Sequence, residues 1–222
     1  MVYVTGDLHG DIDRFKTPAI KKLRRNDTLI ILGDFGFLWQ GGNEEERVLN
    51  WISKRKYNVL FLEGTHDNLE MLNNYPVVDY AGGKAHKIDE NIYHLMRGEI
   101  FEIEDKRIFC FGGGISEDAD IRLETGTWWP EEKPTEEEKL NAWRTLRKYD
   151  KEVDYICTHV GPGRFARFLD FDAGEANEVE AFLDGVAKDV QYKRWLFAAY
   201  HKDKGLGSKA TAVYRQVIAL GE

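Results

Sequence analysis

The chain has 222 residues, of which 31 are basic and 39 acidic, and its formal net charge is −8. The apolar fraction of 42% and the charged fraction of 32% are typical of globular proteins and exclude disordered, collagen-like and coiled-coil classes. The acidic balance argues against binding of a nucleic-acid polymer, which depends on basic side chains that meet phosphates.

The first third of the chain alternates short apolar runs with longer amphipathic stretches. The apolar runs predict strands at residues 2–4, 28–32 and 58–62. Between them lie a basic amphipathic stretch at 13–25 and a helix at 44–56, whose acidic start and basic end suit the helix dipole. This order predicts a βαβαβ unit with a parallel sheet and right-handed crossovers.

The rest of the chain has a different pattern. Residues 91–95, 99–103 and 107–111 are short apolar segments that predict an antiparallel meander. A helix is predicted at 135–149, where Thr135 and Glu138 have the spacing of a capping box. Strands at 154–158, 195–200 and 212–220 and a helix at about 177–188 complete the prediction. We expect one α/β domain over residues 1–222, with two mixed sheets packed together.

Two cysteines and the N-terminus bear on the cellular environment. Cys110 and Cys157 lie in apolar stretches, and we expect free buried thiols, which suit a reducing compartment. A disulfide between them is compatible with the count but has no secretory context to support it. The N-terminus lacks the features of a signal peptide, and no apolar stretch nears the ~20 residues that cross a bilayer. These observations predict a cytoplasmic protein without membrane contact.

Acids and histidines follow the ends of five predicted strands. They are Asp7, His9, Asp34, His66, His159 and His201. Each alone has an ordinary structural explanation, such as a turn at Gly-Asp. Open α/β sheets, however, build their sites at the carboxyl ends of strands, where these six side chains can converge. Because imidazole and carboxylate groups bind transition metals and zinc, the pattern predicts a metal site. For His86 and His94, in the meander, we prefer a structural role.

Five short segments resemble, in order and spacing, the sequence blocks of the calcineurin-like metallophosphoesterases: Gly6-Asp7-Leu8-His9-Gly10, Gly33-Asp34, Gly64-Thr65-His66-Asp67, Thr158-His159 and Ala199-Tyr200-His201. The resemblance implies an α/β/β/α sandwich that hydrolyses a phosphomonoester or phosphodiester with metal-activated water. It also implies a first metal held by Asp7, His9, Asp34 and His201, with Asp34 bridging to a second. His66 would contact the scissile phosphate as an acid or as a transition-state stabiliser. Mn²⁺ is the preferred ion, with Fe, Zn or Ni as alternatives.

Two positions depart from the family pattern. The family has an asparagine ligand at the position of Thr65, and the first histidine of Gly-His-x-His at the position of Ala199. An alternative register places His201 on the first histidine and Asp203 on the second. We prefer the first register because the apolar strand then runs directly into the block. The second ion would keep Asp34 and His159, with at most a weak Thr65 hydroxyl, so we expect one tightly bound and one weak metal.

Other features leave alternatives open. The long connection between Phe111 and Pro134 is either a lid, with a tryptophan on a base and Arg122 on a phosphate, or an aromatic plug over the sheet edge, which we favour. Asn68 could contact substrate or begin a helix. The leading hypothesis is a hydrolase of a small phosphorylated substrate or nucleotide. The alternative is a catalytically weakened member that binds a phosphorylated ligand or a partner. The sequence leaves the oligomeric state open.

Overall fold

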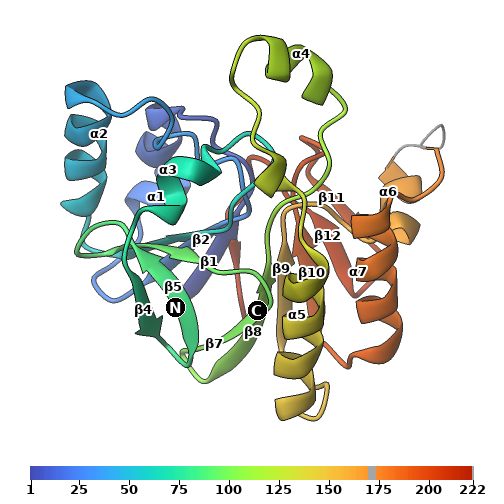
Figure 1. Ribbon diagram of the computed structural model, residues 1–222. Helices are drawn as coiled ribbons and strands as arrows, with labels where there is room; N and C mark the ends of the chain where they lie inside the picture. The colour runs from blue at the N-terminus through green and yellow to red at the C-terminus, as the bar shows by residue number, and fades with distance from the viewer. Residues whose placement is uncertain (170–173, 222) are drawn as a thin grey trace.

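Two β-sheets pack face to face, and helices cover the outer face of each, as the computed structural model shows (Figure 1). The structure describes residues 1–169 and 174–221. The expected α/β class with two mixed, packed sheets is therefore confirmed.

The first sheet contains β1 (Val2–Thr5), β2 (Thr28–Ile31), β3 (Asn58–Phe61), β4 (Val77–Tyr80), β5 (Gly83–Lys87), β6 (Ile92–Leu95) and β13 (Ile218–Ala219). The second contains β7 (Glu99–Ile103), β8 (Lys106–Phe111), β9 (Tyr155–Thr158), β10 (Arg194–Phe197), β11 (Lys204–Leu206) and β12 (Ala210–Ala212). The α-helices are α1 (Pro18–Lys21), α2 (Asn43–Ser53), α3 (Leu69–Asn73), α4 (Ala119–Glu124), α5 (Glu136–Lys148), α6 (Gly163–Leu169) and α7 (Glu178–Asp189). Short 3₁₀ helices, η1 and η2, cover Ile12–Lys16 and Pro130–Glu132.

Parallel strands form the centre of both sheets. The first sheet has the order β13-β1-β2-β3-β6-β5-β4, in which β1, β2, β3 and β6 run parallel. The second has the order β11-β12-β10-β9-β8-β7, in which β12, β10, β9 and β8 run parallel. The predicted parallel arrangement of the first three strands is confirmed.

Alternation along β2 shows how the layers are held together. Ile30 joins the core between the two sheets, whereas Leu29 and Ile31 pack in a second core under α1, α2 and α3. Successive strand residues point to opposite faces, so an entirely apolar strand is buried on both sides. A third core lies between the second sheet and α5 and α7, where Leu146 and Leu183 pack near Trp195.

The predicted meander is only partly correct. Segment 99–111 forms the antiparallel hairpin β7–β8, but β6 pairs with β3 and β5 in the other sheet. The chain changes sheets around Gly98, whose φ of +76° suits glycine. Strands β4 and β5 were not predicted, because β4 is a partly exposed edge strand and β5, with the sequence GKAHK, has no apolar run.

The predicted strand at 212–220 is wrong. Ala212 ends β12 in the second sheet, and Ile218 begins β13 in the first. Between them the chain crosses sheets, and the Asp203 carboxylate accepts backbone N–H groups of Tyr214, Arg215 and Gln216 in place of a strand partner. The strand predicted at 195–200 likewise ends earlier, at Phe197.

Segment 13–25 contains less helix than its amphipathic pattern predicts. It forms η1 and the single turn α1, which Pro18 begins. Thr17 stays extended, as a residue before proline usually does. The other expected helices are confirmed, and α5 has the predicted capping box between Thr135 and Glu138.

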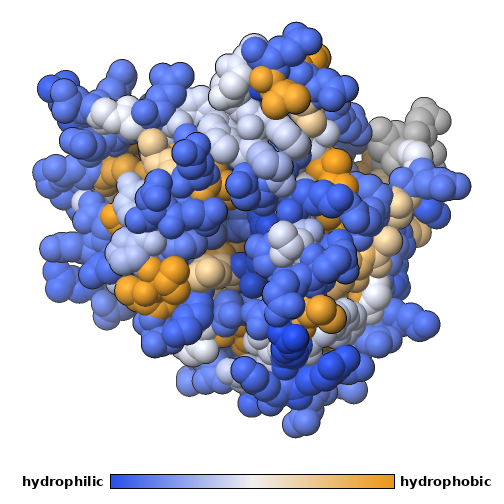
Figure 2. Space-filling model, viewed as in Figure 1, coloured by the Kyte–Doolittle hydropathy of each residue, from blue (hydrophilic) through white to orange (hydrophobic). Residues whose placement is uncertain are grey.

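Cys110 and Cys157 are free and buried, as expected, and lie opposite each other on β8 and β9. Among the described residues, no helix is long and apolar enough to cross a membrane. Figure 2 shows a mostly hydrophilic face with small apolar patches, one of them over α4, where Ile121 and Leu123 are exposed.

Candidate metal centre

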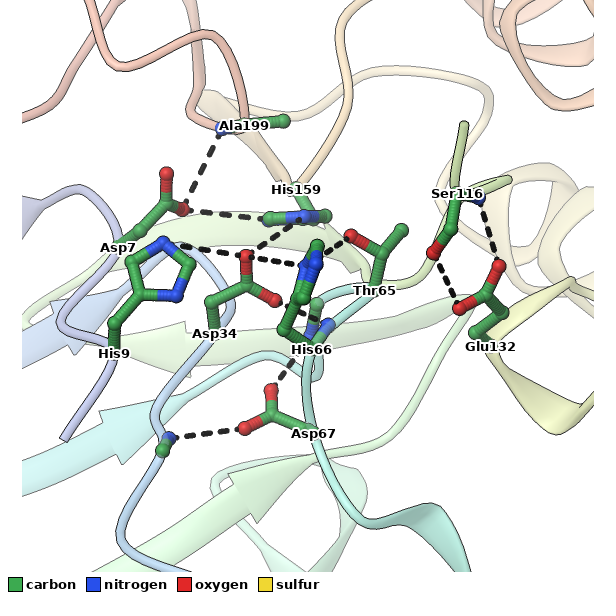
Figure 3. Close-up of polar contacts among 12 residues, drawn as sticks. Asp7, His9, Asp34, Thr65, His66, Asp67, Ser116, Glu132, His159 and Ala199 are labelled. Atoms are coloured by element: carbon green, nitrogen blue, oxygen red, sulfur yellow. Dashed lines mark hydrogen bonds and ion pairs between the residues drawn. The ribbon is translucent and has the colours of Figure 1, made fainter. Parts of the chain in front are cut away.

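The acids and histidines singled out in the sequence follow the ends of parallel strands at one edge of the two sheets. Asp7 and His9 follow β1, Asp34 follows β2 and His66 follows β3. From the second sheet, His159 follows β9 and His201 follows β10. Figure 3 shows Asp7, His9, Asp34, His66 and His159 turned toward one another.

The backbone at this edge has conformations that residues other than glycine rarely adopt. His9, Asp34, Ala199 and His201 have φ values of +48°, +44°, +59° and +50°. The left-handed region costs L-residues of the order of 1–2 kcal/mol each. Such strain clusters at functional sites, where the surrounding structure must over-determine it.

Two glycines leave the space that these side chains occupy. A Cβ atom at Gly33 would lie 2.1 Å from His159 Nδ1, and one at Gly64 would lie 2.0 Å from Asp34 Oδ1. Any larger residue would therefore displace His159 or the Asp34 carboxylate.

A first group of three donors consists of Asp7, His9 and His201. The Nε2 atoms of His9 and His201 are 3.0 Å apart, and His201 Nε2 is 3.4 Å from Asp7 Oδ2. Donor atoms of the three residues all lie within 4.8 Å of one another, which allows one ion to contact all three. This arrangement matches the register in which His201 is the last histidine of the fifth block.

A second group consists of Asp7, Asp34 and His159. Asp34 Oδ2 lies 3.7 Å from His159 Nε2 and 3.6 Å from His9 Nε2, so it faces histidines of both groups. Asp7, and not Asp34, is the residue that the two groups share, which the sequence pattern did not indicate.

Two buried atoms in these groups lack a hydrogen-bond partner among the described residues. They are Asp7 Oδ2 and His159 Nε2, on side chains that are 1% and 0% exposed. Buried polar atoms are rarely left unsatisfied, because the desolvation cost is of the order of 1–3 kcal/mol. A divalent cation between the carboxylates and imidazoles would satisfy both, so the residues present fit a metal ion.

The pKa shifts show that the site favours positive charge. Burial alone would raise the pKa of Asp34, but His159, His66 and His9 hold it well below its ordinary value. Burial likewise would lower the pKa of His159, yet Asp34 and Asp7 raise it to about 10. A proton or a metal ion can supply the charge that these carboxylates require, and the two compete for the imidazole.

His66 lies beside these groups with its side chain 37% exposed. Its Nδ1 atom is 3.1 Å from Thr65 Oγ1 and 3.5 Å from Asp34 Oδ2. Its Nε2 atom is 3.3 Å from Asp118 Oδ2. The hydrogen bond with Asp34 raises the pKa of His66 above its ordinary value, against burial. Sequence reasoning missed Asp118, whose only signal was its place in an unusually long connection.

Asp67 is a second residue that sequence reasoning left without a role. Its buried carboxylate accepts the backbone N–H groups of Gly64, Gly36 and Phe35 at 2.8, 3.0 and 3.3 Å. It thereby joins the loops that follow β2 and β3, which carry Asp34 and His66. Burial and the nearby Asp34 raise the pKa of Asp67 to about 6. Its position as the last residue of the third block was the available signal.

The two departing positions lie next to a cavity. The Thr65 hydroxyl contacts His66, and the Ala199 backbone N–H donates to Asp7 Oδ1 at 3.4 Å. Both residues line a cavity of about 860 Å³, together with His66 and Asp118. A second cavity of about 580 Å³ is lined by His9, Gly36, Trp39, Glu44 and His66. The two cavities therefore meet at His66.

Three other residues considered from the sequence are engaged elsewhere. The Asp203 carboxylate accepts three backbone N–H groups, which disfavours the alternative register. Asn68 caps α3 by accepting from Met71 N and donates to Trp39 O, as the helix-start explanation predicts. Arg122 is 7% exposed, and its guanidinium binds within its own segment and to Thr65 O instead of facing a phosphate.

The aromatic residues of the same connection agree with the plug interpretation. The rings of Trp129 and Trp39 pack edge to face with centroids 5.1 Å apart. Trp129 also packs against the core under α1, α2 and α3.

Two comparisons with known proteins gave a match. The sequence model described as calcineurin-like phosphoesterase matches residues 1–193, a range that ends immediately before β10. The crystal structure of phosphopantetheinyl hydrolase (PptH) from Mycobacterium tuberculosis is similar, with 15% sequence identity and a TM-score of 0.44. That match covers 96% of this chain and 89% of the other. A search of curated proteins gives no significant match.

Proposed function

The chain belongs to the calcineurin-like phosphoesterase family, and we propose that it hydrolyses a phosphate ester at the centre formed by Asp7, His9, Asp34, His159 and His201. The observation that carries this proposal is the pair of buried, unpartnered atoms, Asp7 Oδ2 and His159 Nε2, within two groups of metal-binding side chains.

The first ion would be held by Asp7, His9, Asp34 and His201. Asp34 would also contact a second ion, held together with His159. Bound divalent ions, Mn²⁺ in our proposal and otherwise Fe, Zn or Ni, supply Lewis acidity and lower the pKa of an attacking water molecule. Thr65 and Ala199 offer the second ion little, so it would be the weaker of the two.

His66 is the proposed catalytic residue. Its Nδ1 atom faces Asp34, so a phosphate held at this centre would lie within reach of a proton on that nitrogen. From there His66 can stabilise or protonate the leaving oxygen.

The shape of the site favours a phosphodiester over a phosphomonoester. Two cavities adjoin the centre and share His66 as a common wall. A phosphorus atom at the centre could therefore place one ester substituent in each. Both are large enough for parts of a small phosphorylated compound such as a nucleotide. Trp39 in the smaller cavity offers an aromatic surface to an apolar or planar group.

A second function is supported by Thr65 and Ala199. Because neither supplies the ligand that the family pattern has there, the chain could bind a phosphorylated ligand or a partner with little turnover. The test is hydrolysis of p-nitrophenyl phosphate and bis-p-nitrophenyl phosphate by chelator-stripped protein, with and without added Mn²⁺. Turnover of the diester that requires Mn²⁺ supports the hydrolase. Tight binding of the intact diester without turnover supports the binding function.

A further inference from the structure

We propose that Asp118 is a positioning residue for His66, and that the segment between β8 and α5 exists in part to deliver it. This inference rests on the proposed function of His66. We call residues 112–134 the α4 segment. It rises above the two sheets in Figure 1 and places Asp118 Oδ2 3.3 Å from His66 Nε2.

The contact at Nε2 fixes the direction in which the opposite nitrogen, Nδ1, points. Nδ1 is directed at Thr65 Oγ1 and Asp34 Oδ2, on the side of the metal centre. In the imidazolium form both nitrogens carry hydrogen, so Nε2–H donates to Asp118 while Nδ1–H stays on the side of the metal centre, and the ring plane is held from both ends. The ring then cannot turn over without losing contacts at both nitrogens. Catalytic groups need this kind of orientation, because small displacements cost large factors in rate.

A buried arginine fastens the α4 segment to the loop that carries His66. Arg122 Nη1 donates to the backbone oxygen of Thr65 at 2.8 Å, one residue before His66. Its Nε and Nη2 atoms donate to Thr127 O at 3.1 and 2.8 Å, within the segment. The guanidinium is therefore a direct link between the two loops.

The segment also has a polar interior of its own. The Glu132 side chain, 3% exposed, accepts from Ser116 N at 2.8 Å and from Ser116 Oγ at 2.6 Å (Figure 3). Ser116 Oγ in turn accepts from Arg122 Nη1 at 2.9 Å. Charge-assisted hydrogen bonds of this kind are stronger than neutral ones, and a connected network is rigid. Asp118 thus projects from a braced segment and not from a free loop.

The experiment compares Asp118→Asn with Asp120→Asn. Asp120 is an exposed acid in the first turn of α4, so its variant removes the same charge without touching His66. Asp118 precedes α4 and its side chain makes no capping hydrogen bond to that helix. The only contact of that side chain with Arg122 is a long ion pair of 3.8 Å from Oδ1 to Nη1, so we expect either variant to keep the segment folded. Circular dichroism and thermal unfolding check this point.

The first readout is independent of turnover. In ¹⁵N-labelled protein, the imidazole resonances of His66, identified with His66→Gln, report which nitrogen carries the hydrogen bond. We expect Asp118→Asn to shift the His66 Nε2 resonance, and Asp120→Asn to leave it in place. Unchanged His66 resonances in Asp118→Asn would overturn the proposal, whether or not the protein proves to be a hydrolase.

The second readout is the dependence on the leaving group, with bis-p-nitrophenyl and diphenyl phosphate as a matched pair. Phenolate leaves less readily than p-nitrophenolate and depends more on a well-placed acid. Asp118→Asn should therefore lower kcat for diphenyl phosphate by about tenfold and change bis-p-nitrophenyl phosphate by less than about threefold. Equal losses on both substrates would indicate a structural role only. Absence of wild-type turnover would count against the proposed function and leave the resonance test to decide the role of Asp118.

Discussion

The Nδ1 atom of His159 lies 2.9 Å from the backbone oxygen of Leu32, and this contact joins the two sheets at the metal centre. His159 follows β9 in the second sheet, and Leu32 follows β2 in the first. Because Nδ1–H donates to the carbonyl, Nε2 is left to face Asp34. A second partner of this kind orients a histidine ligand and fixes which nitrogen binds the metal.

This arrangement predicts the metal content. In the proposed arrangement four protein ligands would hold the first ion, whereas the second would have Asp34 and His159, with Asp7 near both and little help from Thr65 or Ala199. Protein purified without chelator should retain closer to one tightly bound ion per chain than two, measured by elemental analysis after dialysis. Two equivalents that resist dialysis would contradict the weak second position.

Restoring the family ligands should strengthen that position. Thr65→Asn and Ala199→His add donors beside the larger cavity, where there is space for them. Ala199 already has a positive φ, like the histidines at 9 and 201, so the backbone need not change. The double variant should bind a second ion and hydrolyse the diester at least about tenfold faster in Mn²⁺, a barrier change of about 1.4 kcal/mol.

Each single variant leaves the second ion one ligand short and should gain less. If the double variant binds two ions but hydrolyses no faster, the missing ligands do not limit the rate. The binding function would then be favoured.

Gly33→Ala should damage the centre through His159. The added Cβ would meet His159 Nδ1 at 2.1 Å, and the φ of +110° is unfavourable for alanine. Gly42→Ala is the matched control, because Gly42 has a φ of +97° but no atom within 4 Å of the added Cβ. Backbone strain alone should cost the control about 1–2 kcal/mol of unfolding free energy. In urea unfolding, Gly33→Ala should lose more unfolding free energy than the control, and it should also lose metal. Equal losses in the two variants, with full metal content, would argue against the close fit at Gly33.

His86 should make the protein sensitive to acid. It lies 3.0 Å from His94, nitrogen to nitrogen, and His94 contacts Glu63 at 2.6 Å. These contacts agree with the structural role expected for both histidines. Burial and the nearby His94 lower the pKa of His86 to about 4. The unfolded chain, with a pKa of about 6.5, takes up the proton first, so stability present above pH 6.5 is lost as the pH falls toward 4.

The measurement is the midpoint of thermal unfolding between pH 7 and 4. His86→Gln cannot titrate and should show a shallower decline than the wild type over this range. Parallel curves for the two proteins would show that His86 does not contribute.

The site residues that follow the central strands could be predicted from the sequence, because an apolar run marks each strand and the residues directly after it must lie at its end. An apolar run such as 28–32 marks a buried strand, and parallel strands bring Asp34 and His66 to one edge. Sheet membership was harder to predict. Whether residues 91–95 join β3 or the hairpin after Gly98 depends on pairing between distant segments, which periodicity does not contain.

Asp118 illustrates the same limit in the site. It is one acid among several in a long connection, and only the fold brings it to His66. For Arg122, the less favoured of the two alternatives left by the sequence was a contact with a phosphate. Its charge is used instead to hold the α4 segment to Thr65 O.

The central claim is that Asp34 links two metal positions of a phosphoesterase, and Asp34→Asn tests it most directly. The side chain keeps its shape but loses the charge that faces His9 and His159. The measurement is Mn²⁺-dependent hydrolysis of bis-p-nitrophenyl phosphate by stripped and reloaded wild type, Asp34→Asn and the surface control Asp120→Asn. We predict that Asp34→Asn stays folded but loses at least about 100-fold in rate, roughly 2.7 kcal/mol, while the control matches the wild type. A folded Asp34→Asn protein that retains its metal and its rate would contradict the account.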